Sequence, residues 1–457
     1  MALSQRKRLF GTNGIRGVPG KDLTLEFIVD MGQAIGTYFS QGPLLIGYDG
    51  RRAGTIISKA IESSLMATGI DCFECGLLPT PALQYAVRRL GYKGGIMVTA
   101  SHNPPQYNGI KVVGSNGVEI PREEEQKIEA IYYDRSFRLA DWRSVGKFGK
   151  EGRALDTYID GIVSKVKEEK IRSKGFKVVL DPGNGAQALA APYVLERLGC
   201  RVFTINGHID PDFSGRGAEP TPDVLEGLSE AVRSFGADLG VAYDGDGDRA
   251  IFADEKGSIY WGDRSGALLT DYVLSKNPRS LVVTTVSTSQ LIDDIAEKYE
   301  SRVIRTRVGS IDVSKAMVEK GAIFGLEENG GCFYAPHIEV RDGAMTTALM
   351  LELLSERDEP ISKLFSALPS YHQKKMKLEC PRESVGKVLE VVEHQAKGEV
   401  DKTDGVKLWT DEKTWILVRP SGTEPVIRIF AESDDEAKLD ELVNKFSKLV
   451  GELLPYS

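Results

Sequence analysis

Short apolar runs alternate with segments of helical periodicity over the first third of the chain. The apolar runs predict strands, and the periodic segments between them predict helices. The predicted strands are residues 44–48, 70–76 and 95–99, and the predicted helices are residues 55–67 and 81–90. This alternation is typical of a mostly parallel sheet covered by helices. A charged, aperiodic stretch at 134–153 follows, which we interpret as a linker.

The same alternation begins again after this stretch and continues over the middle of the chain. Strands are predicted at 176–180, 201–205, 237–243, 250–252, 281–285, 302–305 and 322–325, and helices at 187–198 and 223–235. Each block has the length of a domain, about 100–150 residues. The pattern therefore predicts three consecutive α/β units with mixed, mostly parallel sheets.

The last part of the chain has a different order of elements. Strands are predicted at 371–379, 406–409, 415–418 and 426–430, and helices at 385–395 and 434–453. Ser384 and the run Ser433–Glu436 are the expected N-caps of the two helices. This order favours a smaller α+β domain with an antiparallel sheet. We therefore predict units at residues 1–150, 151–254, 255–369 and 370–457.

Composition narrows the functional classes. Lys and Arg number 58 against 66 Asp and Glu, a net charge of −8, which disfavours nonspecific nucleic-acid binding. There is no apolar run long enough to span a membrane and no secretory signal pattern at the N-terminus. Five cysteines, an odd number, do not form a disulfide framework, so a cytoplasmic location is expected.

Five loops place glycine beside polar or charged residues where predicted strands end, the edge at which α/β sheets bind ligands. The first, Gly11–Gly17, contains Arg16 and would suit an anion or be a tight surface turn. The second, Thr99–Pro105, puts Ser101 directly after a strand. Ser101 is either a nucleophile or the cap of an Asn-Pro turn. No hydrolase triad is evident, but a serine that accepts phosphate needs none.

The third loop holds Asp244, Asp246 and Asp248 at alternate positions with glycines between them. Three carboxylates so close repel one another unless they share a hard cation such as Mg²⁺, so we predict a metal site rather than an acidic surface turn. An EF-hand is excluded because Arg249 occupies the position that needs glycine and because the flanking segments are predicted strands.

The fourth and fifth loops carry groups suited to a sugar phosphate. Glu327 and Asn329 lie in Gly325–Gly331 and could bind vicinal hydroxyls, although a polar turn has the same composition. The fifth loop, Arg419–Pro425, combines hydroxyls and backbone N–H groups with an arginine, and Arg428 follows it. It predicts a phosphate cradle rather than a structural turn, and it lacks the spacing of a nucleotide P-loop.

Together the five loops resemble the α-D-phosphohexomutase family, in the family's order and over nearly the whole chain. The most specific motifs are Thr99–Pro104 (Thr-Ala-Ser-His-Asn-Pro) and Asp244–Arg249 (Asp-Gly-Asp-Gly-Asp-Arg). The resemblance implies four domains around a central cleft and interconversion of hexose 1-phosphate and hexose 6-phosphate. It implies a phosphoserine enzyme, a hexose 1,6-bisphosphate that also acts as activator, and one Mg²⁺ per chain. Sugar phosphates would be its partners, and a homodimer is one assembly that it allows.

The resemblance also assigns roles to residues of this chain. Ser101 falls on the phosphoserine, which would complete the metal site of the three aspartates, and His102 and Arg16 lie beside it. Lys111 and Arg249 match positions that handle protons and stabilise the transition state. Glu327 matches the carboxylate that binds sugar hydroxyls. The residues that match the substrate-phosphate clamp are Arg419, Ser421, Gly422, Thr423 and Arg428.

Departures from the family pattern leave the preferred sugar open. Asn329 and Gly331 stand where Ser and His are common, Ser310 follows Val308-Gly309 where many members have His or a charge, and Asn13 stands where Ser is common. The form Glu-Glu-Asn-Gly-Gly is similar to archaeal phosphomannomutase and phosphoglucosamine mutase sequences. Phosphoglucomutase activity is a further option. A Mg²⁺-dependent sugar phosphatase with an aspartyl nucleophile and a non-catalytic sugar-phosphate-binding protein are the alternatives.

Overall fold

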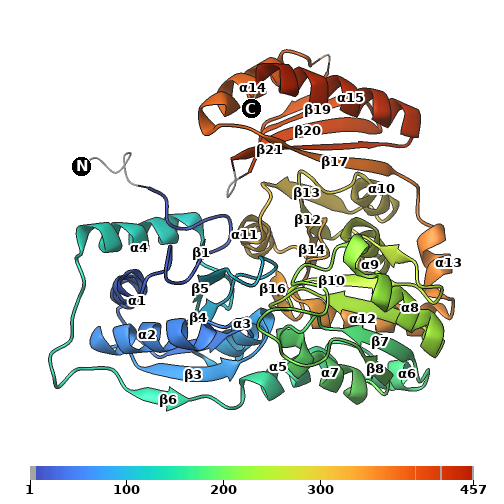
Figure 1. Cartoon of the computed structure of the whole chain (residues 1–457). Helices are drawn as coiled ribbons and strands as arrows, with labels where there is room; N and C mark the ends of the chain where they lie inside the picture. Colours follow the sequence, from blue (N-terminus) through green and yellow to red (C-terminus); the bar gives the residue numbers. More distant parts are fainter. Residues whose placement is uncertain (1–6, 397, 422–424, 455–457) are drawn as a thin grey trace.

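The computed structural model describes residues 7–396, 398–421 and 425–454. Within them the chain forms four sheets in sequence order, each with its own helices (Figure 1). The predicted fold class, three α/β units followed by a smaller α+β unit, is confirmed. None of the helices within the described ranges has the length and apolar character needed to cross a membrane.

The first sheet has the strand order β1-β5-β4-β2-β3-β6. Its strands are β1 (Ile15–Gly17), β2 (Leu44–Tyr48), β3 (Cys72–Leu77), β4 (Gly94–Val98), β5 (Asn108–Gly114) and β6 (Phe148–Lys150). Helices α1 (Leu25–Phe39), α2 (Gly54–Ala67) and α4 (Arg122–Asp134) share one core, and α3 (Thr80–Leu90) packs in another. The interpretation of 134–153 as a linker is wrong in one part, because β6 within it pairs parallel with β3 and so belongs to the first sheet.

The second sheet has the order β11-β10-β9-β7-β8. Its strands are β7 (Lys177–Asp181), β8 (Arg201–Thr204), β9 (Leu239–Tyr243), β10 (Ala250–Ala253) and β11 (Ile259–Tyr260), and its helices are α5 (Ala154–Val163), α6 (Glu168–Arg172), α7 (Ala191–Arg197) and α8 (Glu226–Phe235). The single helix predicted at 187–198 is divided into a 3₁₀ turn, Ala186–Leu189, and α7, since Pro192 has no N–H to continue a helix and sits at the start of the second one. The helix predicted at 223–235 likewise opens as a 3₁₀ turn before α8.

The third sheet has the order β13-β12-β14-β15-β16. Its strands are β12 (Leu281–Thr285), β13 (Arg302–Thr306), β14 (Phe324–Leu326), β15 (Cys332–Tyr334) and β16 (Ile338–Arg341), and its helices are α9 (Gly262–Lys276), α10 (Leu291–Lys298), α11 (Ser310–Lys320), α12 (Gly343–Arg357) and α13 (Ile361–Ser366). Buried side chains of the first three units merge into one hydrophobic core, to which both Leu180 and Phe324 belong. The unit boundaries themselves stay predictions.

The fourth sheet is antiparallel throughout, with the order β17-β21-β20-β19-β18. Its strands are β17 (His372–Glu379), β18 (Val400–Asp401), β19 (Val406–Asp411), β20 (Thr414–Pro420) and β21 (Val426–Ser433), and helices α14 (Val385–Glu393) and α15 (Glu436–Leu453) cover the face away from the third unit (Figure 1). Ser384 precedes α14 but makes no capping hydrogen bond, and Asp435, rather than Ser433, caps α15. This unit has its own main core, and on its other face Trp415, Leu417 and Phe430 pack against Val286 of the third unit.

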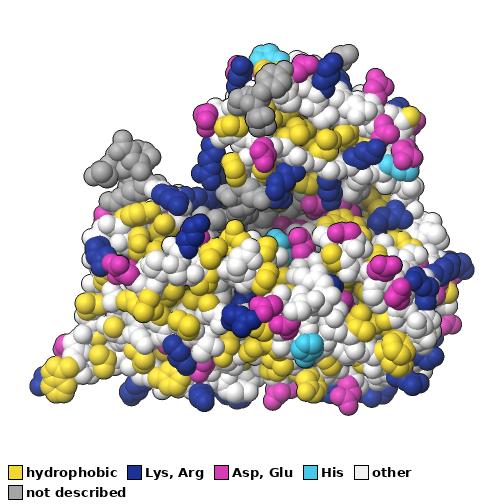
Figure 2. All heavy atoms as spheres, in the orientation of Figure 1, with side chains coloured by type: hydrophobic (Ala, Val, Ile, Leu, Met, Phe, Trp, Pro, Cys, Tyr) yellow, Lys and Arg dark blue, Asp and Glu magenta, His cyan; other side chains and the backbone are white. Residues whose placement is uncertain are grey.

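The face shown in Figure 2 is hollowed between the fourth unit and the units below it, with Lys and Arg side chains along the lower edge of the fourth unit.

Candidate active site

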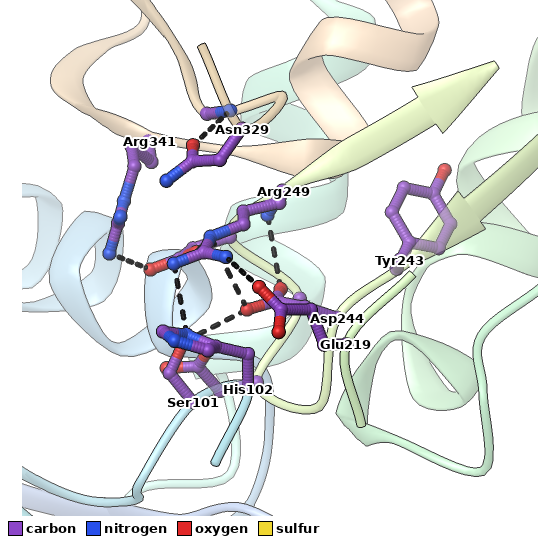
Figure 3. A network of polar contacts seen from close by, with 12 residues as sticks. Ser101, His102, Glu219, Tyr243, Asp244, Arg249, Asn329 and Arg341 are labelled. Atoms are coloured by element: carbon purple, nitrogen blue, oxygen red, sulfur yellow. Dashed lines mark hydrogen bonds and ion pairs between the residues drawn. The ribbon is translucent and has the colours of Figure 1, made fainter. Parts of the chain in front are cut away.

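The loop after β4 presents Ser101 at the centre of the site. The Ser101 side chain is fully buried, and its Oγ donates to Asp244 Oδ2 at 2.9 Å (Figure 3). The backbone of Ser101 has φ +52°, in the left-handed region that few residues other than glycine adopt. A hydroxyl from the first unit is thereby fixed against a carboxylate from the second.

The three aspartates of the loop between β9 and β10 converge as predicted. One oxygen of each of Asp244, Asp246 and Asp248 lies within 4.8 Å of the others, and all three residues are buried. The buried Oδ1 atoms of Asp246 and Asp248 have no hydrogen-bond partner. Buried carboxylate oxygens without partners are costly, and three converging oxygens are what Mg²⁺ prefers. The donor set therefore fits a hard divalent cation, and the flanking strands agree with the exclusion of an EF-hand.

Cations from the first unit compensate part of this negative charge. Lys111 Nζ donates to Asp246 Oδ2 at 2.9 Å, and the Thr80 hydroxyl donates to the same oxygen at 2.6 Å. Burial works against the charged form of both partners, but their mutual attraction outweighs it, raising the pKa of Lys111 and lowering that of Asp246. Burial and the two neighbouring carboxylates raise the pKa of Asp244 to about 8.

His102, Arg16 and Arg249 complete the surroundings of Ser101. His102 Nδ1 is 2.9 Å from Arg249 Nη2 and 3.4 Å from Ser101 Oγ (Figure 3). Because a guanidinium can only donate, Nδ1 accepts, and the imidazole proton resides on Nε2. Burial and the charges of Arg249 and Arg16 hold the pKa of His102 well below its usual range, so this histidine is neutral. Arg16 donates to Asn103 Oδ1, and burial lowers the pKa of Arg16 to about 10.

The predicted sugar loop reaches the same cluster through an arginine that the sequence did not indicate. Glu327 Oε2 is 2.9 Å from Arg341 Nη1, and Arg341 Nη2 is 2.5 Å from Asp248 Oδ2. Arg341 is buried and bridges the sugar loop to the metal loop. Asn329 Oδ1 accepts from the backbone N–H of Gly331 at 3.2 Å, which shapes the turn.

The predicted phosphate clamp lies on the fourth unit, apart from the strands that carry Ser101. Arg419 and Arg428 face each other as partners across β20 and β21. Arg419 Nε donates to Asp404 Oδ2 at 2.8 Å, and the backbone N–H of Ser421 donates to Val426. Gly422 and Thr423, also assigned to the clamp, lie outside the described residues.

Arg341 and Thr80 are the site residues that the sequence analysis missed. Arg341 follows Ile338–Val340 at the end of a short strand, and Thr80 opens α3. Thr80 lies among apolar residues and prolines, without a local signal, whereas Arg341 is followed by Asp342 and Gly343 at a strand end. That charged, glycine-containing strand end is the signal that could have indicated Arg341.

Comparisons with known proteins agree with this architecture. Four family models match, described as phosphoglucomutase/phosphomannomutase alpha/beta/alpha domains I, II and III and C-terminal domain, over residues 7–139, 156–257, 261–371 and 376–449.

Relatives match along almost their full length. The chain is 45% identical to a phosphoglucosamine/phosphogalactosamine mutase of Sulfurisphaera tokodaii, over 97% of this chain and 99% of that one. It is 42% identical to a phosphoglucomutase/phosphomannomutase of Thermococcus kodakarensis, over 98% of this chain and 99% of that one. Among solved structures, a phosphoglucomutase/phosphomannomutase family protein of Burkholderia thailandensis superposes with a TM-score of 0.87 at 27% identity, covering 98% of this chain and 99% of that chain.

Proposed function

Because the chain belongs to the phosphoglucomutase/phosphomannomutase family, and is thus a phosphohexomutase, we propose that it isomerises hexose phosphates through a phosphorylated Ser101. The observation that supports this assignment is the hydrogen bond from Ser101 Oγ to Asp244, at the point where three buried carboxylates converge. The hydroxyl lies among cations that can neutralise a phosphoryl group, which is what phosphoryl transfer requires.

The reaction consists of two balanced transfers. In the first, the bond between phosphorus and Ser101 Oγ breaks while a bond forms to the free hydroxyl of a hexose phosphate, and the proton of that hydroxyl ends on Ser101. The product is a hexose 1,6-bisphosphate. In the second, the other phosphoryl group moves to Ser101 Oγ, and the proton returns to the sugar oxygen that it leaves. No phosphate or proton is gained or lost overall.

The aspartates and their neighbours have separate tasks in this proposal. Asp244, Asp246 and Asp248, with the phosphate on Ser101, would hold one Mg²⁺, which supplies charge neutralisation for the group in transfer. Arg249 and Lys111 keep the transition-state and proton-handling roles that the resemblance gives them. Neutral His102 accepts from Arg249 and so orients that guanidinium beside Ser101.

Substrate recognition is divided between the third and fourth units. Glu327, which pairs with Arg341, would bind sugar hydroxyls, and the clamp around Arg419 and Arg428 would bind the phosphate that is not being transferred. Since both orientations of the bisphosphate present a distal phosphate, one clamp serves both transfers.

The proposal also covers the substrate sugar, the activator and the cellular location. The relatives' names favour glucosamine phosphates and mannose phosphates as the first substrates to test, followed by glucose phosphates. Hexose 1,6-bisphosphate would act as activator by restoring phosphate to Ser101. All five cysteines are free, as suits a cytoplasmic enzyme. The homodimer stays a prediction.

A serine substitution tests the proposal. Ser101→Ala should remove nearly all conversion of hexose 1-phosphates to 6-phosphates. Intact-protein mass after incubation with a hexose 1,6-bisphosphate should show one phosphate on the wild type and none on Ser101→Ala. Ser355→Ala is the matched control, because Ser355 is also buried but donates to a helix carbonyl on α12. Full activity in Ser101→Ala, or release of free phosphate in place of isomerisation, would refute the assignment.

A further inference from the structure

A closed ring of hydrogen bonds surrounds the backbone of Ser101. The Ser101 N–H donates to Thr99 Oγ1 at 2.8 Å, and the Thr99 hydroxyl donates to Asp49 Oδ2 at 2.6 Å. Arg51 Nε donates to the same Asp49 oxygen at 3.1 Å, and Arg51 Nη2 donates to the Ser101 carbonyl at 2.7 Å. Both polar backbone groups of Ser101 are thereby held by three side chains, each of which is buried.

Arg51 also binds the rest of the serine loop. Its Nη2 donates to the Asn103 carbonyl at 2.6 Å, and its Nη1 donates to the carbonyls of Pro104 and Tyr107 at 2.8 and 2.9 Å. With the bonds to Asp49 and Ser101, all five N–H donors of the guanidinium are used. A lysine could not reproduce this pattern, because an ammonium has three donors around a single point.

The hydrogen-bonded ring around Ser101 packs against the second unit, at Phe213 and at Gly245 of the metal loop. The Arg51 guanidinium carbon lies 4.9 Å from the ring centroid of Phe213, a cation–π contact across the two units. A Cβ atom on Gly245 would come within 2.6 Å of the Ser101 carbonyl and 3.2 Å of the Phe213 ring. The serine loop and the aspartate loop are therefore in direct contact, and the hydrogen-bonded ring fixes the serine loop at this contact.

We infer that Asp49, Arg51 and Thr99 are positioning residues that hold Ser101 in its left-handed conformation, so that its Oγ faces Asp244. The inference rests on the proposed phosphoserine function and extends it to residues that contact neither the aspartates nor the sugar loop. Left-handed backbone is unfavourable for serine, and the ring supplies the bonds that maintain it. Loosening the ring would shift the oxygen that accepts phosphate without altering the sugar site.

This mechanism predicts a loss in kcat with little change in KM. A displacement of about 1 Å of a reacting group can reduce the rate by about 100-fold. The affinity for sugar phosphates depends on Glu327 and the fourth unit, neither of which the ring contacts. A residue that merely supports the fold would instead lower the amount of active enzyme or the unfolding temperature.

Thr99 offers a matched pair of variants for the test. Thr99→Val keeps the shape of the side chain and removes the hydroxyl, whereas Thr99→Ser keeps the hydroxyl. Thr270→Val is the control, since Thr270 is also buried and its hydroxyl donates to a carbonyl of its own helix, α9. Steady-state kinetics should be measured with a hexose 1-phosphate, together with the rate at which hexose 1,6-bisphosphate phosphorylates Ser101 and the thermal unfolding midpoint.

We expect Thr99→Val to lower kcat by about 10–100-fold with KM within about 2-fold of wild type, and to slow phosphorylation of Ser101 by a similar factor. Thr99→Ser should restore most of both rates, and Thr270→Val should match wild type. Wild-type kcat in Thr99→Val, a change confined to KM, or an equal loss in Thr270→Val would overturn the inference. Arg51→Lys provides a second test, with the same split between kcat and KM. Retained activity in Ser101→Ala would overturn the proposed function itself, which separates the two failures.

Discussion

Arg341 is the residue on which the charge balance between two loops depends. Its guanidinium bridges Asp248 at 2.5 Å and Glu327 at 2.9 Å, and the side chain is 6% exposed. Arg341→Met keeps most of the apolar volume and removes the charge. Two buried carboxylates then lose their shared cation.

The size of the effect follows from the burial of these ion pairs. Removing one partner of a buried pair costs about 3–5 kcal/mol, because the remaining charge stays desolvated without compensation. We therefore expect Arg341→Met to lower the free energy of unfolding by that amount. Loss of a residue that orients a metal ligand should also reduce activity or metal affinity by about 10–100-fold. The stability and activity of Arg341→Lys should lie between those of the wild type and of Arg341→Met, since one ammonium cannot bridge both carboxylates in the same geometry.

A surface ion pair on the same strand supplies the control. Arg88 Nη1 pairs with Glu339 of β16 at 2.6 Å, but the Arg88 side chain is 43% exposed. An exposed pair is worth at most about 1 kcal/mol, so Arg88→Met should have a small effect. Urea unfolding followed by tryptophan fluorescence measures both variants. If Arg341→Met lowers the free energy of unfolding no more than Arg88→Met does, the buried bridge does not stabilise the two loops as we propose.

Four further predictions follow from other groups. Burial raises the pKa of Asp263 from 3.8 to about 6, against the attraction of Lys375, so the stability that this group contributes is complete below pH 4 and is lost as pH rises through 6. Asp263→Asn stays neutral, so its free energy of unfolding in urea should match that of the wild type at pH 4 and exceed it by about 3 kcal/mol at pH 8. Equal free energies of unfolding at both pH values would contradict this. Arg419→Ala should raise KM by at least about 10-fold in both reaction directions, since an arginine–phosphate pair is charge-assisted, and a defect in one direction alone would exclude a shared clamp. EDTA should abolish activity, and Asp246→Asn should lower kcat more than KM at saturating Mg²⁺; activity that survives EDTA would refute the metal site. Burial raises to about 12 the pKa of four thiols, those of Cys72, Cys75, Cys200 and Cys332. Their reaction with Ellman's reagent at pH 8 should therefore be slower than that of a free thiol by about three orders of magnitude. Fast reaction of two or more thiols would refute this.

The sequence predicted those parts of the fold and site that have a local signature. The run Asp244–Arg249 combines alternating carboxylates with glycines between two apolar strands, and the structure brings the carboxylates together as expected. Ser101 was identified because a strand ends directly before it. In both cases the pattern and the chemistry lie within about ten consecutive residues.

What the sequence did not reveal depends on contacts between distant segments. Strand β6 has three residues without an apolar alternation, and its pairing with β3 alone makes it a strand. Arg51 and Arg341 each stand beside an Asp and a Gly at a strand end, but their roles come from partners about 50–90 residues away, which the local pattern does not reveal. The division of the helix at Pro192 could have been foreseen, since proline lacks the N–H that a helix interior needs.

The separate core of the fourth unit has a consequence for how this protein could diversify. Its main core is built from side chains between Cys380 and Val450, whereas the largest core of the molecule contains side chains from all of the first three units. Recombination between related genes near residues 367–371, where α13 has ended and β17 has not begun, would exchange this core as a whole. The packing at stake would be that of Trp415, Leu417 and Phe430 against Val286 of the third unit. A crossover between the second and third units would instead combine two halves of one core that had not evolved together. Chimeras with a relative's last unit should therefore fold when they keep the apolar contact with Val286, and the unit that we propose binds the distal phosphate would be the easiest to replace in evolution.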